Sequence, residues 1–195
     1  MNSKHSSNLK PVALFALGFR PFFLGAAIAG AGMIPVWVLS FAGLLVPPTD
    51  SAVILWHAHE MVFGFVAAVI AGFLLTASQN WSGRRGLHGG PLAALFALWL
   101  AARAFAFLPA GYSIVYSAVD ISFFPMLAAA LWPYLARRDQ RKHWIFFALI
   151  ALLFAANLLF HLETHGLIHG WLPASHSLAV HTVIAYLTVI GGRVI

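Results

Sequence analysis

Residues 53–77 read VILWHAHEMVFGFVAAVIAGFLLTA, and this stretch decides the fold. Glu60 is its one acidic residue, and it contains no Lys or Arg. About 20 mainly apolar residues suffice for an α-helix to cross the hydrocarbon core of a bilayer. We therefore interpret residues 53–77 as a membrane-spanning helix that carries His57, His59 and Glu60 in its first turns.

The composition of the whole chain agrees with a membrane protein. Of the 195 residues, 62% are apolar and 8% are charged, with a mean hydropathy of +0.88. A soluble domain carries about 25% charged residues, so a water-soluble fold is excluded. The chain has no Cys and 10 His. Disulfides, thiolate metal sites and iron–sulfur clusters are thereby excluded, and histidine becomes the main candidate ligand for a transition metal.

Five further apolar stretches are long enough to span a bilayer, and each is bounded by turn-forming or charged residues. They are residues 22–46, 91–109, 114–135, 143–162 and 174–194. The sequence therefore predicts an all-α fold, a polytopic bundle of about six transmembrane helices that forms a single domain over residues 1–195.

The basic residues predict the orientation of this bundle. With an even number of spans, all Lys and Arg except Arg103 lie at the same membrane face, which the positive-inside rule makes cytoplasmic. These residues are Lys4, Lys10, Arg20, Arg84, Arg85, Arg137, Arg138, Arg141, Lys142 and Arg193. Both termini are predicted to be cytoplasmic, and the formal charge of +6 is explained by topology rather than by nucleic-acid binding.

Ionisable residues gather at the opposite, outer ends of the spans. Such groups are costly within a membrane and usually mark a functional site. Arg103 and Asp120 both lie about 9 Å below the outer surface, at 1.5 Å rise per residue, on spans joined by a tight turn. An Arg103–Asp120 ion pair is therefore expected. The outer group also includes Glu60 and the histidines His57, His59, His161, His165, His169, His176 and His181.

Helical spacing sorts the candidate metal ligands. His57 and His59 are two residues apart, so they point to nearly opposite sides of a regular helix and cannot both bind one ion. Asn157, His161 and His165 share one face of their span. A metal or haem in a bundle draws ligands from several helices, and neutral imidazole suits iron, copper and zinc. The candidate ligands are His57, His59, His161, His165 and His181.

Glu60 and Asp120 are candidates for supporting roles. Glu60 has three interpretations: a carboxylate that orients His57, a proton relay, or a charge at the membrane interface. The first is favoured because metal-bound histidines usually donate their other ring N–H to an acceptor. Asp120 is expected to pair with Arg103 and to hold two helices in register.

Several motifs resemble those of the NnrS family of bacterial haem–copper membrane proteins. The resembling stretches are GFRPFFL at 18–24, WHAHEMVFGF at 56–65, AGFLLTA at 71–77, NWSGR at 80–84, LWLAAR at 98–103, His161-Leu162, His181 and GGRVI at 191–195. The resemblance covers nearly the whole chain, and its most specific part is the combination of the WHAHEM, GFLLTA and NWSGR blocks.

The resemblance implies a multi-pass protein of the bacterial inner (cytoplasmic) membrane that binds haem and copper. It implies a role in nitric oxide metabolism, in denitrification or in relief of nitrosative stress, with nitric oxide or an iron–nitrosyl species as the ligand. His57, His59, His161 and His181 would bind the cofactors, and Arg103 would pair with a haem propionate rather than with Asp120. Family members are usually about twice as long, so this chain would be an N-terminal half whose partner is a C-terminal half or another subunit.

Two other functions fit the same residues. A haem-free transporter or ion permease would use Arg103, Asp120, Glu60 and His181 to line a pathway. A b-type electron-transfer cytochrome would hold a haem between two histidines of facing helices. No activated nucleophile or phosphate-binding loop is evident, which disfavours hydrolase and kinase chemistry. The expected partners are membrane lipid and nitric oxide, with no nucleic acid, and the residues fit either an enzyme or a binding protein.

Overall fold

The computed structural model describes residues 13–45, 53–107 and 113–194, and within these ranges every regular element is helical. The longer helices are α1 (Phe19–Phe41), α2 (Val53–His59), α3 (Ala67–Ser82), α4 (Gly89–Phe105), α5 (Ser113–Leu135), α6 (Ile145–Thr164) and α7 (Leu172–Val194). Short elements are the 3₁₀-helices η1 (Ala13–Ala16) and η4 (Arg138–His143) and the π-helical segment η2 (Glu60–Val66). The prediction of an all-α fold is confirmed.

Helices α2 and α3 and the η2 segment form one continuous rod, Val53–Ser82. This rod and α1, α5, α6 and α7 are the five helices that are long and apolar enough to cross a membrane, among the residues that the structure describes. The predicted third span corresponds to α4, an apolar helix of 17 residues. Its expected end at residue 109 lies outside the described residues, as does the tight turn predicted to follow it. Lys4 and Lys10, which were predicted to be cytoplasmic, also lie outside them.

The end of the first predicted span differs from the structure by five residues. Helix α1 ends at Phe41 instead of residue 46, although Leu44 and Leu45 continue the apolar run. Gly43 adopts a left-handed conformation with φ 72°. The backbone N–H groups of Gly43 and Leu44 then donate to the carbonyls of Ser40 and Leu39, at 3.1 and 2.9 Å. This is a Schellman arrangement, which ends a helix irrespective of the hydropathy that follows.

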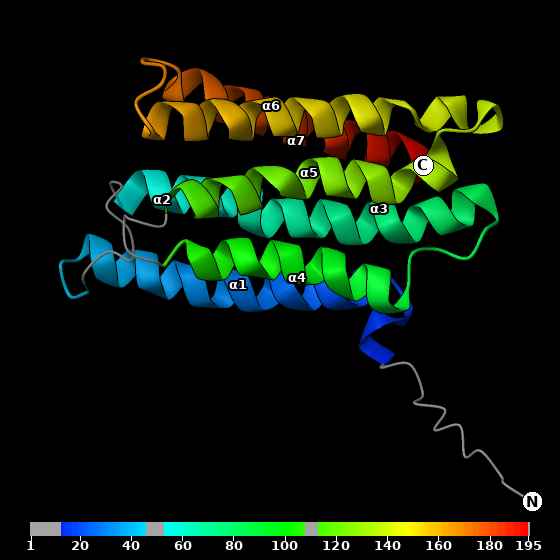
Figure 1. Ribbon diagram of the computed structural model, residues 1–195, viewed down its shortest axis with the longest axis horizontal. Helices are drawn as coiled ribbons and strands as arrows, with labels where there is room; N and C mark the ends of the chain where they lie inside the picture. The colour runs from blue at the N-terminus through cyan, green and yellow to red at the C-terminus, as the bar shows by residue number, and fades with distance from the viewer. Residues whose placement is uncertain (1–12, 46–52, 108–112, 195) are drawn as a thin grey trace, which may run out of the picture.

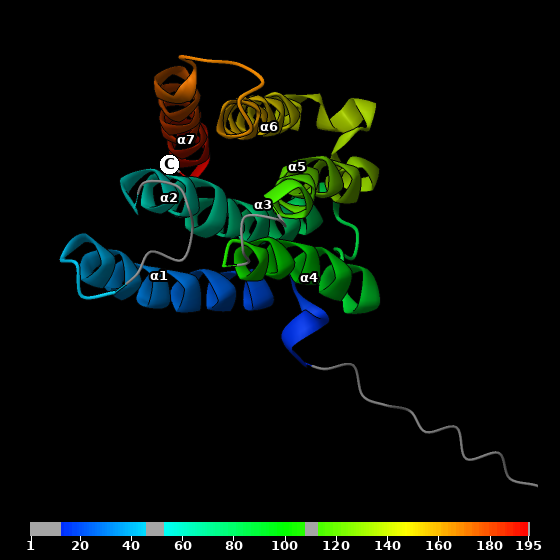
Figure 2. The same ribbon diagram turned by 60° about the vertical axis from the view of Figure 1, so that its left-hand side comes forward.

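Successive helices run in opposite directions and form three layers (Figure 1), with the α2–α3 rod and α5 in the middle layer, α1 and α4 below and α6 and α7 above. Figure 2 shows the same layers from another side. Helix α1 begins and α7 ends at the same end of the bundle, where the loop after α3 and the η4 segment also lie. We call this the basic end, because Arg84, Arg85 and the residues of η4 lie there.

Large apolar side chains cover the outside of the bundle. Ile28, Ile114 and Leu187 are 64%, 73% and 67% exposed, which is the surface expected of helices that face lipid. Small residues instead allow close packing between helices. A Cβ atom at Gly72 would lie 2.8 Å from the Phe23 ring, so the absence of a side chain there lets α1 pack closely against α3. The chain is therefore a multi-pass membrane protein with a well-packed interior.

Candidate metal centre

The end of the bundle opposite the basic end contains a backbone irregularity in the second span. Residues Glu60–Val66 form a π-helical segment, a feature that often occurs at functional sites because it releases backbone groups from the regular ladder. The carbonyl of Gly64 accepts a hydrogen bond from Trp99 Nε1 at 3.0 Å. Gly64 also leaves space for Arg103, since a Cβ atom there would lie 2.9 Å from Arg103 Nη1.

Arg103, in the last turn of α4, lies between two buried carboxylates. Its Nη2 donates to Asp120 Oδ1 of α5, and its Nε lies 3.0 Å from Glu60 Oε2. Arg103, Glu60 and Asp120 are 4%, 0% and 2% exposed. The expected Arg103–Asp120 ion pair is confirmed. Glu60 shares the same guanidinium, which the sequence did not indicate.

His59 occupies the space between Glu60, Asp120 and α6. Its Nε2 lies 3.0 Å from Asn157 Oδ1 and 3.4 Å from Asp120 Oδ2. Its Nδ1 lies 3.4 Å from Glu60 Oε1, and the Tyr116 hydroxyl is 3.3 Å from both of those atoms. Asn157 Nδ2 donates to Asp120 Oδ2 at 2.8 Å, so the Asn157 carbonyl oxygen accepts from His59 Nε2 in the metal-free protein. A metal ion bound at His59 Nε2 would replace that proton.

His161, on α6, contacts the other side of the same carboxylate oxygen. Its Nε2 lies 3.0 Å from Asp120 Oδ2, and its Nδ1 lies 2.9 Å from Ser117 Oγ. The Ser117 hydroxyl donates its single hydrogen to the Ser113 carbonyl at 2.9 Å, so its oxygen accepts from the histidines. In neutral His161 the proton is then on Nδ1, and the lone pair of Nε2 faces a carboxylate oxygen.

The buried charges of this cluster do not balance without a further cation. Glu60 and Asp120 carry two negative charges, and Arg103 supplies one positive charge. Unpaired buried charge is strongly unfavourable, so an additional positive charge beside Asp120 would be stabilising. A proton on an imidazole or a bound metal ion would supply it.

The spacing of the facing atoms suits a metal ion. His59, Asp120 and His161 each offer a ligand atom, and the three atoms lie within 4.8 Å of one another. Ligand atoms about 2.1 Å from one ion are separated by about 3.0 Å at right angles and about 3.4 Å at the tetrahedral angle. The separations from Asp120 Oδ2 to His161 Nε2 and His59 Nε2 are 3.0 and 3.4 Å. We call these three residues the buried centre.

The structure brings together six of the eight residues singled out as site candidates. His59, Glu60, Arg103, Asp120 and His161 form one hydrogen-bonded cluster. His165 joins it through Ser117, whose Oγ lies 2.8 Å from His165 Nε2.

The structure does not bring His57 or His181 to this cluster. His57 points to the opposite side of its helix, as the spacing predicted, and its ring stacks on Trp37 with centroids 4.2 Å apart. Glu60 consequently contacts His59 instead of His57. His181 is exposed on α7, and its Nδ1 lies 2.7 Å from the carbonyl of Ser177 in the preceding turn.

Sequence reasoning did not identify Tyr116 and Ser117 as members of the cluster. They lie four and three residues before Asp120 and therefore share its helical face. Asn157 lies four residues before His161, a relation that the sequence did show. Polar residues at helical spacing from an intramembrane carboxylate are thus the signal that would have found the two missing members.

Gly64 provides a test of how tightly the cluster is packed. Gly64→Ala should lower the free energy of unfolding by about 1–3 kcal/mol, because the new methyl group would meet Arg103 Nη1 and Glu60 Oε2, both at 2.9 Å. Thermal unfolding in detergent would measure the loss. Gly32→Ala is the matched control, since nothing lies within 4 Å of its added Cβ. Equal unfolding temperatures for the two variants would contradict the packing at Gly64.

A haem does not fit between the two imidazoles of the buried centre. The Nε2 atoms of His59 and His161 lie 3.4 and 3.0 Å from the same oxygen of Asp120, so this carboxylate occupies the space that a macrocycle bound by both imidazoles would need. Aromatic rings occupy the remaining space, with Phe160 and Phe63 at 4.3 and 4.9 Å from the His59 ring. The donor set instead fits a single metal ion.

Comparison with known proteins gives one family. The model of the family described as NnrS protein matches residues 13–195, which is nearly the whole chain. No curated protein and no solved structure matches the chain. The family match includes all the residues of the buried centre, and the chain belongs to the NnrS protein family.

Proposed function

We propose that this NnrS-family membrane protein binds one transition-metal ion at the buried centre and acts in nitric oxide metabolism. The observation that carries the proposal is that His59, Asp120 and His161, from three separate helices, direct their ligand atoms at one another inside the protein. Two imidazoles and a carboxylate are a common donor set for transition metals. The excess of buried negative charge favours a cation at the same place.

Copper is the metal that we propose. Neutral imidazole suits copper, and divalent copper binds a given nitrogen and oxygen site more tightly than the other first-row metals. The resemblance to the NnrS family implies copper as well. A copper ion held there would supply a redox-active site for nitric oxide, a small uncharged molecule that reaches a membrane interior without a polar channel.

The surrounding residues would hold the ligands in place. Arg103 and Asn157 both donate to Asp120, which fixes the orientation of its carboxylate. Ser117 Oγ accepts a hydrogen bond from His161 Nδ1, which leaves the lone pair of His161 Nε2 free to bind the ion. On the other side of His59, the Tyr116 hydroxyl donates a hydrogen bond to Glu60 Oε1 at 3.3 Å. Such contacts to ligands commonly tune metal affinity.

We place any haem outside the buried centre. His57 and His181 are the remaining candidate ligands, and Nδ1 of His57 has no hydrogen-bond partner among the residues that the structure describes. His181 is exposed on α7, where a C-terminal half or another subunit would reach it. We further propose that the protein lies in the bacterial cytoplasmic membrane with its basic end toward the cytoplasm.

A metal titration of the purified chain tests the proposal. The detergent-purified protein is first stripped of metal and then titrated with Cu²⁺. Elemental analysis should find about one copper per chain. The electron paramagnetic resonance spectrum should show nitrogen ligation of the copper and should change on exposure to nitric oxide. His59→Ala/His161→Ala should lose this copper, because it removes both imidazoles. His181→Ala is the matched control, since it removes an exposed histidine from the same end of the bundle.

The same preparation separates the alternatives. Equal copper content in the wild type and in His59→Ala/His161→Ala would contradict the buried centre. A Soret band in the visible spectrum that nitric oxide does not shift would favour the electron-transfer cytochrome. A colourless, metal-free protein that carries ions across vesicles would favour the permease.

A further inference from the structure

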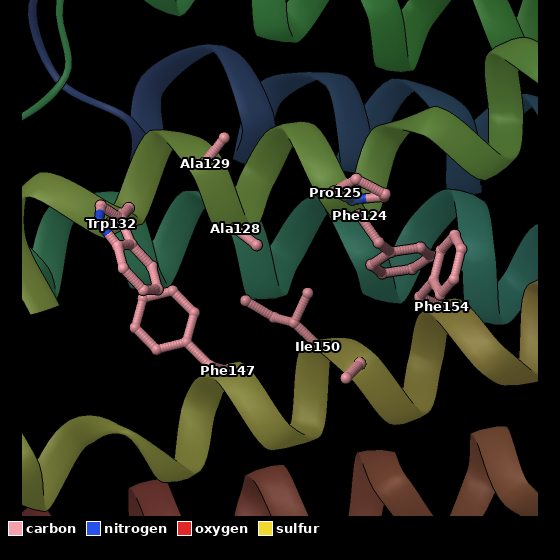
Figure 3. A pocket seen from close by; sticks show the side chains of 9 residues that line it. Phe124, Pro125, Ala128, Ala129, Trp132, Phe147, Ile150 and Phe154 are labelled. Carbon is pink, nitrogen blue, oxygen red and sulfur yellow. The ribbon is translucent and has the colours of Figure 1, made fainter. Parts of the chain in front are cut away.

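A groove on the lipid-facing side of the bundle lies between α5 and α6, and its inner end at Phe124 is one helical turn from Asp120. Its volume is about 470 Å³. Figure 3 shows Ala128 and Ala129 in its middle, Trp132 and Phe147 at one end, and Phe124 and Phe154 at the other. The lining is almost entirely apolar. The groove exists because small alanines on both helices leave a channel between pairs of bulky rings.

The length of the groove, and its position from the basic end to the middle of the bundle, match one leaflet of a bilayer. Its α5 wall runs from Trp132, near the end of α5 at the basic end, to Phe124 at mid-helix. Eight residues at 1.5 Å rise correspond to about 12 Å. One leaflet contributes about half of the 30 Å hydrocarbon core. A lipid chain entering at the basic end would therefore lie along the groove and end near the bilayer centre.

Cationic residues lie close to the entrance along the chain. Three residues after Trp132, α5 ends at Leu135, and η4 follows with Arg138 and Arg141, both exposed. Arg84 reaches the same place from the loop after α3, since its Nη1 donates to the Pro133 carbonyl at 2.9 Å. The acidic residue Asp139 in this region is 3.1 Å from Arg137 Nε and offsets that cation.

Aromatic rings at the entrance agree with a lipid–water boundary. Trp132 and Trp144 are 64% and 46% exposed, and tryptophan is enriched at the depth of the headgroups. The Trp132 and Phe147 rings are 5.7 Å apart and form the wall of the entrance. The apolar channel thus begins at headgroup depth, beneath a cluster of positive charge.

We propose that this surface binds an anionic phospholipid, with one acyl chain in the α5–α6 groove and the headgroup phosphate on Arg138, Arg141 and Arg84. Basic sites between transmembrane helices on the cytoplasmic side commonly bind anionic lipid headgroups. A helix of a second copy would cover the groove but would not neutralise the arginines. The charge at the entrance therefore favours a lipid as the occupant.

Native mass spectrometry of the intact protein tests the site with defined lipids. Dioleoylphosphatidylglycerol should remain bound in preference to dioleoylphosphatidylcholine. Arg138→Gln/Arg141→Gln should raise the dissociation constant for phosphatidylglycerol about fivefold per charge removed, corresponding to about 1 kcal/mol each, and leave phosphatidylcholine unchanged. Arg20→Gln is the matched control, because Arg20 lies at the same end on α1.

A second pair of variants tests the groove itself. Ala151→Phe fills the channel from α6 and should weaken both lipids about equally. Val180→Phe is its control, placed on an exposed position of α7. The proposal is overturned if the two lipids bind alike and no variant alters them. It is equally overturned if the wild type is a dimer that Ala151→Phe dissociates, since the groove would then seat a second copy.

Discussion

Arg103→Met should lower the free energy of unfolding by about 3–5 kcal/mol, which is the usual cost of removing one partner from a buried ion pair. The guanidinium contacts both Asp120 and Glu60, so its loss leaves two carboxylates in the protein interior without a fixed cation. Chemical or thermal unfolding in detergent micelles would measure this loss. Arg85→Met, at an exposed position, is the matched control and should change stability little.

Restoring the charge balance should recover much of that stability. Arg103→Met/Asp120→Asn should be more stable than Arg103→Met alone, because one of the two unpaired charges has been removed. Adding Glu60→Gln should recover more, since the structure shows that Glu60 shares the same guanidinium. Additive losses through this series would contradict a coupled network.

The fold could be predicted from the sequence because hydropathy alone identifies a membrane span. The ends of the spans were less predictable, since they depend on backbone conformation. Gly43 ended α1 although apolar residues follow, and Gly83, with φ 64°, ended α3 five residues beyond the predicted end of its span. The π-helical segment was not predictable, because it depends on the packing of Trp99 and Arg103 against Gly64.

The depth of the candidate site was predicted from the sequence, whereas its membership was predicted only in part. The depth of a residue below the membrane surface follows from the number of residues that precede it in the helix. This count predicted that Arg103 and Asp120 lie at the same depth. To predict which face of a helix is buried, one needs a contrast between a polar and an apolar face. These spans are apolar on every side, so the sequence does not show which side chains point into the bundle. The two-residue spacing predicted that the side chains of His57 and His59 point to opposite sides of their helix. It did not predict which of them faces α5 and α6, and the structure shows that it is His59, which lies beside Asp120 and His161.

Asp120→Asn should reduce copper affinity more than any other isosteric change in the cluster. Asp120 Oδ2 is the oxygen that faces both imidazoles, so the variant removes a ligand atom and a negative charge while it keeps the shape of the side chain. Changes to groups around the ligands typically lower metal affinity by 10–100-fold. Loss of a ligand should exceed that range, as measured by competition with a chelator of known copper affinity.

Glu60→Gln is the control that separates ligation from charge. Glu60 lies in the same network, is 0% exposed and contacts the same arginine, so its amide variant removes an equal buried charge. Its side chain lies on the Nδ1 side of His59, whereas the ion would bind at Nε2. Glu60→Gln should therefore weaken copper binding by at most 100-fold and preserve the nitrogen ligation in the resonance spectrum. Identical affinities in the two variants would mean that copper responds only to the net charge of the cluster, and the assignment of Asp120 as a ligand would be wrong.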